Sequence, residues 1–279
     1  MQPTQQTCLN CGAGFFGNYC NQCGEKVYSQ HDKKLSHFFE EGLHFITHFD
    51  TKFLKTLWTI FSKPGFYSKE YCEGKRKKYF KPVSLFLISI VIYLLFPLLQ
   101  GMNISLGNHI NNNKAMHIGY SLSWAKHKME KQHISEGELS AKFNHISPKF
   151  AKILLLLLLP LSAFSLSLLF RNRKRYFFDH FILATEFNTF SLLAFFLIIP
   201  AIFILTNTLT HLKIDYGDVP LFWIFQILII LTVLTASFRT FYGVKFFEAL
   251  LKSILFMISF LVILFIYRQI TFIAVMLFI

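Results

Sequence analysis

Five strongly apolar runs dominate the order of hydrophobic and polar positions from residue 83 onward. Each is long enough to cross about 30 Å of hydrocarbon as an α-helix. They predict membrane spans at about 83–100, 153–170, 187–210, 219–238 and 249–270. The fifth run includes Lys252 and Arg268, which we expect to reach opposite interfaces of a tilted helix. The apolar residues after position 270 are too few for a sixth span and are expected to form an interfacial tail.

A second pattern precedes these spans. Between residues 35 and 61, apolar side chains recur at steps of three and four, and Lys, Glu and Asp fill most positions between them. This period is typical of a helix that lies in the plane of the membrane interface. A basic cluster follows, for which two roles stay open: contact with anionic lipid headgroups, or enforcement of topology alone. Its members are Lys75, Arg76, Lys77 and Lys78.

These patterns divide the chain into a polar segment at 1–28, an interfacial helix with a basic juxtamembrane segment at 31–81, and a transmembrane domain at 82–279. The long connection at 101–149 has the composition of a polar connector, although Trp124 to Gln132 has helical character and Ser135 to Glu138 resembles a helix start. Composition agrees with an integral membrane protein, since 53% of the 279 residues are hydrophobic and the mean hydropathy is +0.45.

The distribution of Lys and Arg residues among the loops predicts the orientation of the chain in the membrane. Twelve Lys and Arg residues lie between Lys26 and Lys81, and the loops after the second and fourth spans are also basic, whereas the loop between the third and fourth spans holds only Lys213. By the positive-inside rule, the N-terminus is expected in the cytoplasm and the C-terminus outside a bacterial inner membrane. Because most of the net charge of +13 flanks the spans, it does not indicate nucleic-acid binding. The polar N-terminus lacks the apolar core of a cleavable signal peptide.

The N-terminal segment holds the strongest chemical motif. Two CxxCG units, with Cys8 and Cys11 in the first and Cys20 and Cys23 in the second, have the spacing of a zinc ribbon. Four thiolates fill a tetrahedral shell, so one structural zinc is expected. Disulfides or a redox CxxC pair are less favoured, because no βαβ pattern surrounds the cysteines. The aromatic residues between the two units have two open roles, packing over the metal or recognition of a partner.

Two further groups of polar residues are weaker candidates. Glu40, His44 and His48 lie one helical turn apart and could bind a second metal, although interfacial anchoring is the favoured explanation and no HExxH motif is present. Glu186 and His180 lie at the start of the third span, where a polar site inside the membrane is expected to be functional. Pro160 and Pro200 would kink the second and third spans, as in transporters if the kinks line a cavity.

Several motifs together resemble the domain of unknown function 3667 family of bacterial membrane proteins. They are the CxNCG, FxGxYC and CGxK patterns of the ribbon, the stretch from His44 to Asp50, Lys63-Pro64-Gly65, Glu70-Tyr71, the stretch from Gly74 to Pro82, and the RKRYFFDH sequence that ends at His180. The resemblance implies an N-terminal zinc ribbon joined to a multi-pass membrane domain. It implies no biochemical activity.

The sequence thus predicts an all-α polytopic membrane protein with about five transmembrane helices and a small N-terminal zinc ribbon of four cysteines. The favoured function is a non-enzymatic adaptor or sensor whose ribbon binds a cytoplasmic protein. Transport of a small solute or lipid is the alternative. An enzyme is least favoured, because the sequence shows neither a nucleophile paired with a base nor a glycine-rich phosphate loop.

Overall fold

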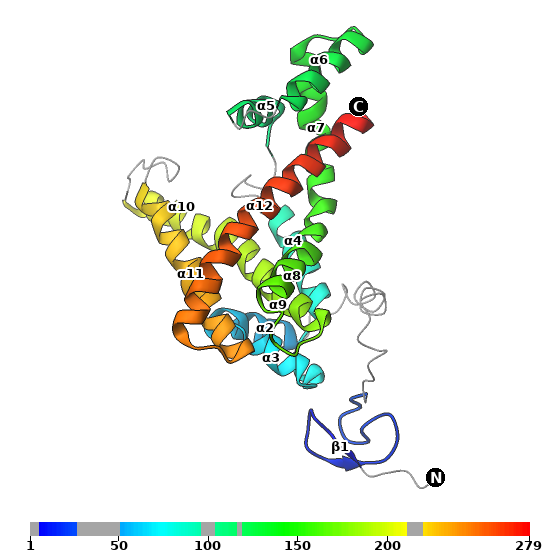
Figure 1. Cartoon of the computed structure of the whole chain (residues 1–279), viewed down its shortest axis with the longest axis vertical. Coiled ribbons are helices and arrows are strands. Elements are labelled where there is room, and N and C mark those ends of the chain that lie inside the picture. Colours follow the sequence, from blue (N-terminus) through cyan, green and yellow to red (C-terminus); the bar gives the residue numbers. More distant parts are fainter. Residues whose placement is uncertain (1–5, 27–50, 96–103, 116–118, 211–219) are drawn as a thin grey trace.

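The computed structural model describes residues 6–26, 51–95, 104–115, 119–210 and 220–279, and it is helical apart from a small ribbon near the N-terminus (Figure 1). Within these residues, five helices are long and apolar enough to cross a membrane. They cover Arg76–Leu95, Glu136–Leu169, Phe177–Leu209, Ile224–Tyr242 and Phe246–Phe278. The expected fold class, an all-α multi-pass membrane protein with an N-terminal group of four cysteines, is confirmed.

Short helices precede and separate the spans. The chain runs through α2 (Thr51–Ser62), α3 (Phe66–Cys72), η2 (Arg76–Lys78), α4 (Pro82–Leu95), α5 (Leu106–Ala115), α6 (Tyr120–Gln132), α7 (Glu136–Leu154), η3 (Leu155–Leu157), α8 (Leu158–Leu169), α9 (Phe177–Leu193), η4 (Ala194–Ile198), α10 (Ile199–Thr210), α11 (Pro220–Tyr242) and α12 (Phe246–Phe278). The ribbon and the C-terminus lie at opposite ends of the helical bundle (Figure 1). Helix α12 continues to Phe278, beyond the end expected near residue 270.

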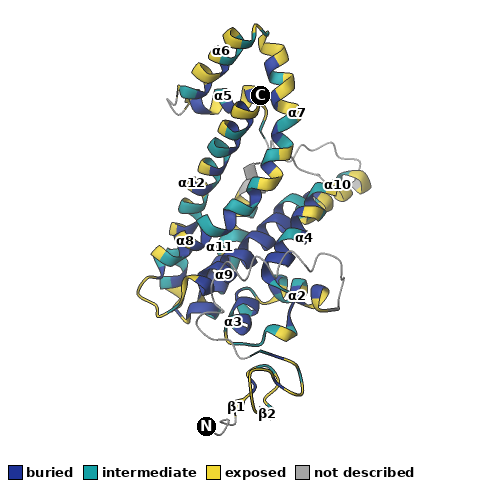
Figure 2. Cartoon of the chain, turned by 90° about the vertical axis from the view of Figure 1, so that its right-hand side faces the viewer, coloured by how far each residue is buried: buried dark blue, intermediate teal, exposed yellow. Residues whose placement is uncertain are grey.

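Helix α9 forms the centre of the bundle. Every residue of α9 from Phe178 to Leu193 is buried, and Figure 2 shows this helix enclosed by its neighbours. Helices α8 and α4 pack along it, and α2 and α3 also pack against it. A helix enclosed on all sides needs no apolar stripe, which explains why α9 has no amphipathic pattern. Most of its polar side chains, such as His180, Glu186 and Asn188, have partners inside the protein.

The described part of the predicted interfacial helix is α2. One face of α2, which includes Phe53 and Ile60, is buried in the cluster that joins α2, α3 and α9. Leu54 and Trp58 on the other face are 69% and 75% exposed. Large apolar side chains in such positions are typical of a helix at a membrane surface.

Two prolines coincide with irregular turns inside the spans. Pro200 has no N–H group for the carbonyl of Phe196, and the chain forms a π-helical turn at Ala194–Ile198. Pro160 stands in the same relation to Leu156, where the chain forms the 3₁₀ turn Leu155–Leu157. The expected distortions of the second and third spans are therefore present.

In its described residues, the connection between the first two spans forms the three helices α5, α6 and α7. Ser135 caps α7 in a capping box with Glu138, which confirms the predicted helix start. Apolar residues of α5, α6 and α7 pack around Phe272, Val275 and Met276 at the end of α12. These contacts exclude water from one face of otherwise polar helices, because the end of α12 supplies the missing apolar surface.

Candidate functional site

The ribbon is built from two turns with the same backbone pattern, one at each CxxCG unit, and we call these turns the knuckles. Strands β1 (Gln6–Thr7) and β2 (Gly14–Phe15) pair antiparallel, and an isolated bridge joins Tyr19 to Lys26. In each knuckle, the glycine N–H group donates to the carbonyl of the first cysteine at 2.8 Å. Gly12 and Gly24 have φ angles of +79° and +67°, which place their backbones in the left-handed region where glycine is favoured.

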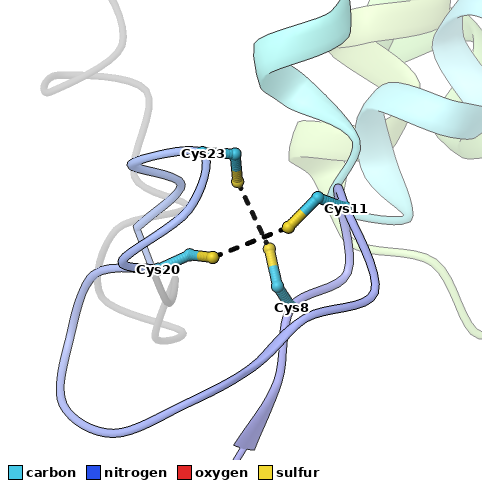
Figure 3. Close-up of side chains that lie close together, drawn as sticks. All are labelled: Cys8, Cys11, Cys20 and Cys23. Atoms are coloured by element: carbon cyan, nitrogen blue, oxygen red, sulfur yellow. Dashed lines mark hydrogen bonds between the residues drawn. The ribbon is translucent and has the colours of Figure 1, made fainter.

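The two knuckles bring the four cysteine sulfurs together (Figure 3). The Sγ atoms of Cys8 and Cys23 are 3.5 Å apart, those of Cys11 and Cys20 are 3.6 Å apart, and all four lie within 4.8 Å of one another. Disulfide sulfurs would be about 2 Å apart, and all four cysteines are free. A tetrahedron with metal–sulfur bonds of about 2.3 Å has edges of about 3.8 Å. The cluster therefore has the geometry to hold one metal ion.

The aromatic residues between the knuckles divide into two groups. Phe15 is 4% exposed and packs with Cys8 and Cys20 inside the ribbon. Phe16 and Tyr19 are 54% and 59% exposed. Of the two roles predicted for these aromatics, Phe15 has the packing role, and Phe16 and Tyr19 form an apolar tip on the ribbon surface.

Other residues of the ribbon contact the corner between α3 and α4. The Lys77 backbone N–H group donates to the Glu25 carboxylate at 3.1 Å. Leu9 lies so close to Gly74 that a Cβ atom there would approach the leucine Cδ1 to 2.8 Å. A cleft of about 320 Å³ lies between the two parts and is lined by both. The ribbon thus rests directly on the basic segment that precedes the first span.

That segment is organised by a buried carboxylate. Glu70 of α3 is 5% exposed and accepts hydrogen bonds from Lys75 at 2.8 Å, from Lys78 at 2.5 Å and from the Tyr79 hydroxyl. Burial opposes its ionisation, but the hydrogen bonds from the two lysines and the tyrosine outweigh burial and lower the pKa of Glu70 to about 2. Two of the four predicted headgroup cations therefore pair with Glu70, although their own side chains stay partly exposed.

The other two cations of the cluster differ in exposure. Lys77 is exposed, whereas the Arg76 guanidinium lies over the rings of Tyr71 and Phe178 at 5.5 and 5.4 Å. Contact between this cluster and lipid headgroups stays a prediction. Lys77 is the member with the fewest internal contacts among those described here, since only its backbone bonds to another residue.

A second buried carboxylate joins α9 to the start of α3. One oxygen of Glu186 accepts from the Gly65 backbone at 2.7 Å, and the other accepts from the Ser68 backbone at 3.0 Å and from the Ser68 hydroxyl. Gly65 precedes α3 with a φ angle of +78°, and a Cβ atom there would meet the Ser237 carbonyl at 2.6 Å. Glu186 therefore caps α3 from another helix, in place of a local capping side chain.

Comparison with known proteins places this region in a family context. Residues 50–94 match the family described as Protein of unknown function (DUF3667). No curated protein and no solved structure matches the chain. The matched residues run from α2 into α4 and include Gly65, Ser68 and the Glu70 network. The ribbon and Glu186 lie outside the match.

The remaining candidates have separate positions. His180 Nδ1 lies 2.7 Å from the hydroxyl of Tyr242 in α11, whereas Glu186 bonds to the start of α3. Cys72 is half-buried beside Asp179, and desolvation of its thiol raises the pKa of Cys72. Glu40, His44 and His48 lie outside the described residues. The structure therefore assembles the four cysteines into one site and places Glu186 and His180 in two distinct ones.

Sequence reasoning missed Glu70 and the partners of Glu186. The sequence does contain a signal for Glu70, because this acid precedes the four consecutive cations by about one helical turn and a short loop. No comparable signal links Glu186 to Ser68, because 118 residues separate them.

Proposed function

We propose that the protein is a membrane adaptor or sensor whose zinc-loaded ribbon binds a cytoplasmic protein at the inner membrane of a bacterium. The observation that carries the proposal is that the ribbon contacts the membrane domain and also exposes two aromatic side chains. Glu25 and Leu9 contact the membrane domain, while Phe16 and Tyr19 are exposed on the ribbon surface. Exposed aromatics on a rigid support are typical anchors of protein interfaces.

The choice of zinc follows from the ligands. A site of four cysteine thiolates matches structural zinc, whose shell is closed to water and substrate. Fewer than about 30 residues cannot bury a core large enough to fold alone, so the metal would hold the tip in shape. In this proposal, the ribbon is a binding module rather than a catalytic one.

Residues near the start of the first span support the part of the proposal that places the ribbon at the membrane surface. Lys77 and the apolar face of α2 with Leu54 and Trp58 are exposed near the start of the first span. A cation and large apolar side chains together favour an anionic leaflet. The ribbon would then sit within reach of proteins that approach the membrane surface.

The test uses the full chain expressed in its own membranes, with a photo-crosslinker next to the tip. Phe16→Ala and Tyr19→Ala should abolish one specific crosslinked partner while leaving the bound zinc unchanged. Trp124→Ala is the matched control, because this partly exposed aromatic lies in α6 at the far end of the molecule. An identical set of crosslinked products in all three variants would contradict the proposal.

A further inference from the structure

A cavity lies inside the membrane domain, between the two proline-distorted spans. Its volume is about 250 Å³, far above the roughly 10–15 Å³ that one water molecule needs. Leu155 of η3 and Leu158 of α8 line one side, and Phe195 and Phe196 of the π-helical turn line another. The irregular turns before Pro160 and Pro200 therefore border the same space. π-helical turns inside α-helices occur frequently at functional sites.

The cavity wall is apolar except at four positions, which are Asn188, Ser191, Gln226 and Arg268. The Asn188 amide is already engaged, since it donates to the Ser162 hydroxyl and to the Ala184 carbonyl. The Ser191 hydroxyl is buried and has no hydrogen-bond partner among the described residues. Within the same part of the chain, no acidic residue lines the cavity. The wall therefore suits an apolar ligand with few polar groups better than a metal cation, which needs several oxygen ligands.

Arg268 places a positive charge at the end of the cavity that is nearer to one membrane interface. It lies 22 residues after Phe246 at the start of α12, which corresponds to about 33 Å of helix. That distance is close to the hydrocarbon thickness of a bilayer, so Arg268 lies near the interface at the end of the molecule opposite the ribbon. Met257, Phe260 and Leu264 extend the wall from this cation toward the middle of α12.

The cavity also reaches the lipid-facing surface. Leu261 lines it and is nevertheless 62% exposed. The neighbouring Ile258 and Val262 are 54% and 53% exposed. A ligand can therefore enter laterally from the bilayer without crossing a polar barrier.

We propose that this cavity binds one alkyl chain of an anionic lipid, whose phosphate or carboxylate is held by Arg268. The chain lies along α12 toward Ser191 and fills space between the distorted turns of the second and third spans. The proposal does not depend on the ribbon or on its partner. It assigns an amphiphile-binding site whose lining, apart from Phe86, lies outside residues 50–94.

The test uses the purified full chain in a mild detergent, with bound lipid counted by native mass spectrometry. The probes are palmitate, phosphatidylglycerol and phosphatidylcholine, which separate a carboxylate, an anionic phosphate and a zwitterionic headgroup. Arg268→Gln should weaken binding of the two anionic probes about tenfold, as expected for loss of a charged hydrogen bond. Phosphatidylcholine should bind the wild type weakly, and Arg268→Gln should not change its binding.

Two further variants complete the design. Ser191→Leu fills the cavity without removing a described hydrogen bond, so it should reduce binding of every probe while leaving the melting temperature equal or higher. Lys252→Gln is the matched control, since this cation of α12 pairs with Glu248 and does not line the cavity. The proposal is wrong if Arg268→Gln and Lys252→Gln retain anionic probes equally, or if Ser191→Leu binds them as the wild type does.

Discussion

At the scale of single residues, the two buried carboxylates hold the corner on which the ribbon rests. Glu70 gathers cations from the following loop, and Glu186 reaches from α9 to the start of α3. Neither is left with an unsatisfied charge, because each accepts at least three hydrogen bonds. Buried carboxylates with complete donor sets are structural elements, so their removal should first affect folding.

Glu186→Gln should destabilise the protein by about 2–3 kcal/mol, since the amide nitrogen would face N–H groups that now donate to a carboxylate. Reversible unfolding in detergent measures the change. Thr189→Val is the control, because this buried hydroxyl of the same helix has no hydrogen-bond partner in the described part of the chain, and its loss should be neutral or stabilising. Equal stability of the Glu186→Gln variant and the wild type would refute the capping role.

Glu70→Gln should cost about 1–2 kcal/mol, a value kept small because its lysine partners are 39% and 36% exposed. The lowered pKa of Glu70, about 2, means that its contribution is complete above its ordinary value of 4.5 and is lost as the pH falls toward 2. The difference in unfolding free energy between wild type and variant should therefore shrink below pH 4.5. Glu73→Gln, at a less buried acid of the same corner, serves as the control and should show neither effect.

At the scale of elements, the ribbon and α3 are both short and each depends on support from outside its own apolar core. The ribbon has a core of only a few side chains, namely Cys8, Phe15 and Cys20 with Ala13 and Cys23 against them. Helix α3 has seven residues and obtains its cap from α9. Elements this short are not stable alone, so the metal and the capping carboxylate replace the apolar burial that longer elements have.

Metal analysis of the purified chain should find one zinc ion per molecule, and Cys11→Ser should release it. Hydrogen exchange should then become fast throughout 6–26 and stay slow in α9, because the metal supplies most of the folding free energy of the ribbon alone. Cys72→Ser is the control, since this cysteine lies outside the cluster and should leave the metal content unchanged. Two zinc ions per chain would point to a further site, with Glu40, His44 and His48 as its candidates.

At the scale of the whole molecule, the spans place the ribbon and the C-terminus at opposite ends (Figure 1). The C-terminus is part of the small bundle at that end, where the Gln132 amide donates to the Ile279 carbonyl at 2.8 Å. This bundle, formed by α5, α6, α7 and the end of α12, is therefore expected outside the cytoplasm together with residue 279.

Reporter fusions test this orientation. Alkaline phosphatase fused after Ile279 should be active and a fluorescent protein at the same point should be dark. Fusions after Lys174, in the basic loop that follows α8, should give the opposite pair of results. Matching results at both positions would show that one of the spans is false.

The sequence by itself determined the class of the molecule and the grouping of the four cysteines. Both depend on local information: the length of an apolar run decides whether a helix spans a bilayer, and four cysteines at ribbon spacing need only a short turn between them to meet. Ser135 and Glu138 likewise predict a helix start from the sequence, because both partners of a capping box lie within one turn.

Only the tertiary structure decided how the polar groups are used. Glu186 is satisfied by Ser68 across 118 residues, Lys75 and Lys78 pair with Glu70 while staying partly exposed, and α5, α6 and α7 pack against the end of α12. The same holds for the cavity between the turns at Pro160 and Pro200, whose wall comes from helices far apart in the chain. Such pairings depend on which helix faces meet, and in a chain where most helices are apolar all round, periodicity does not specify those faces.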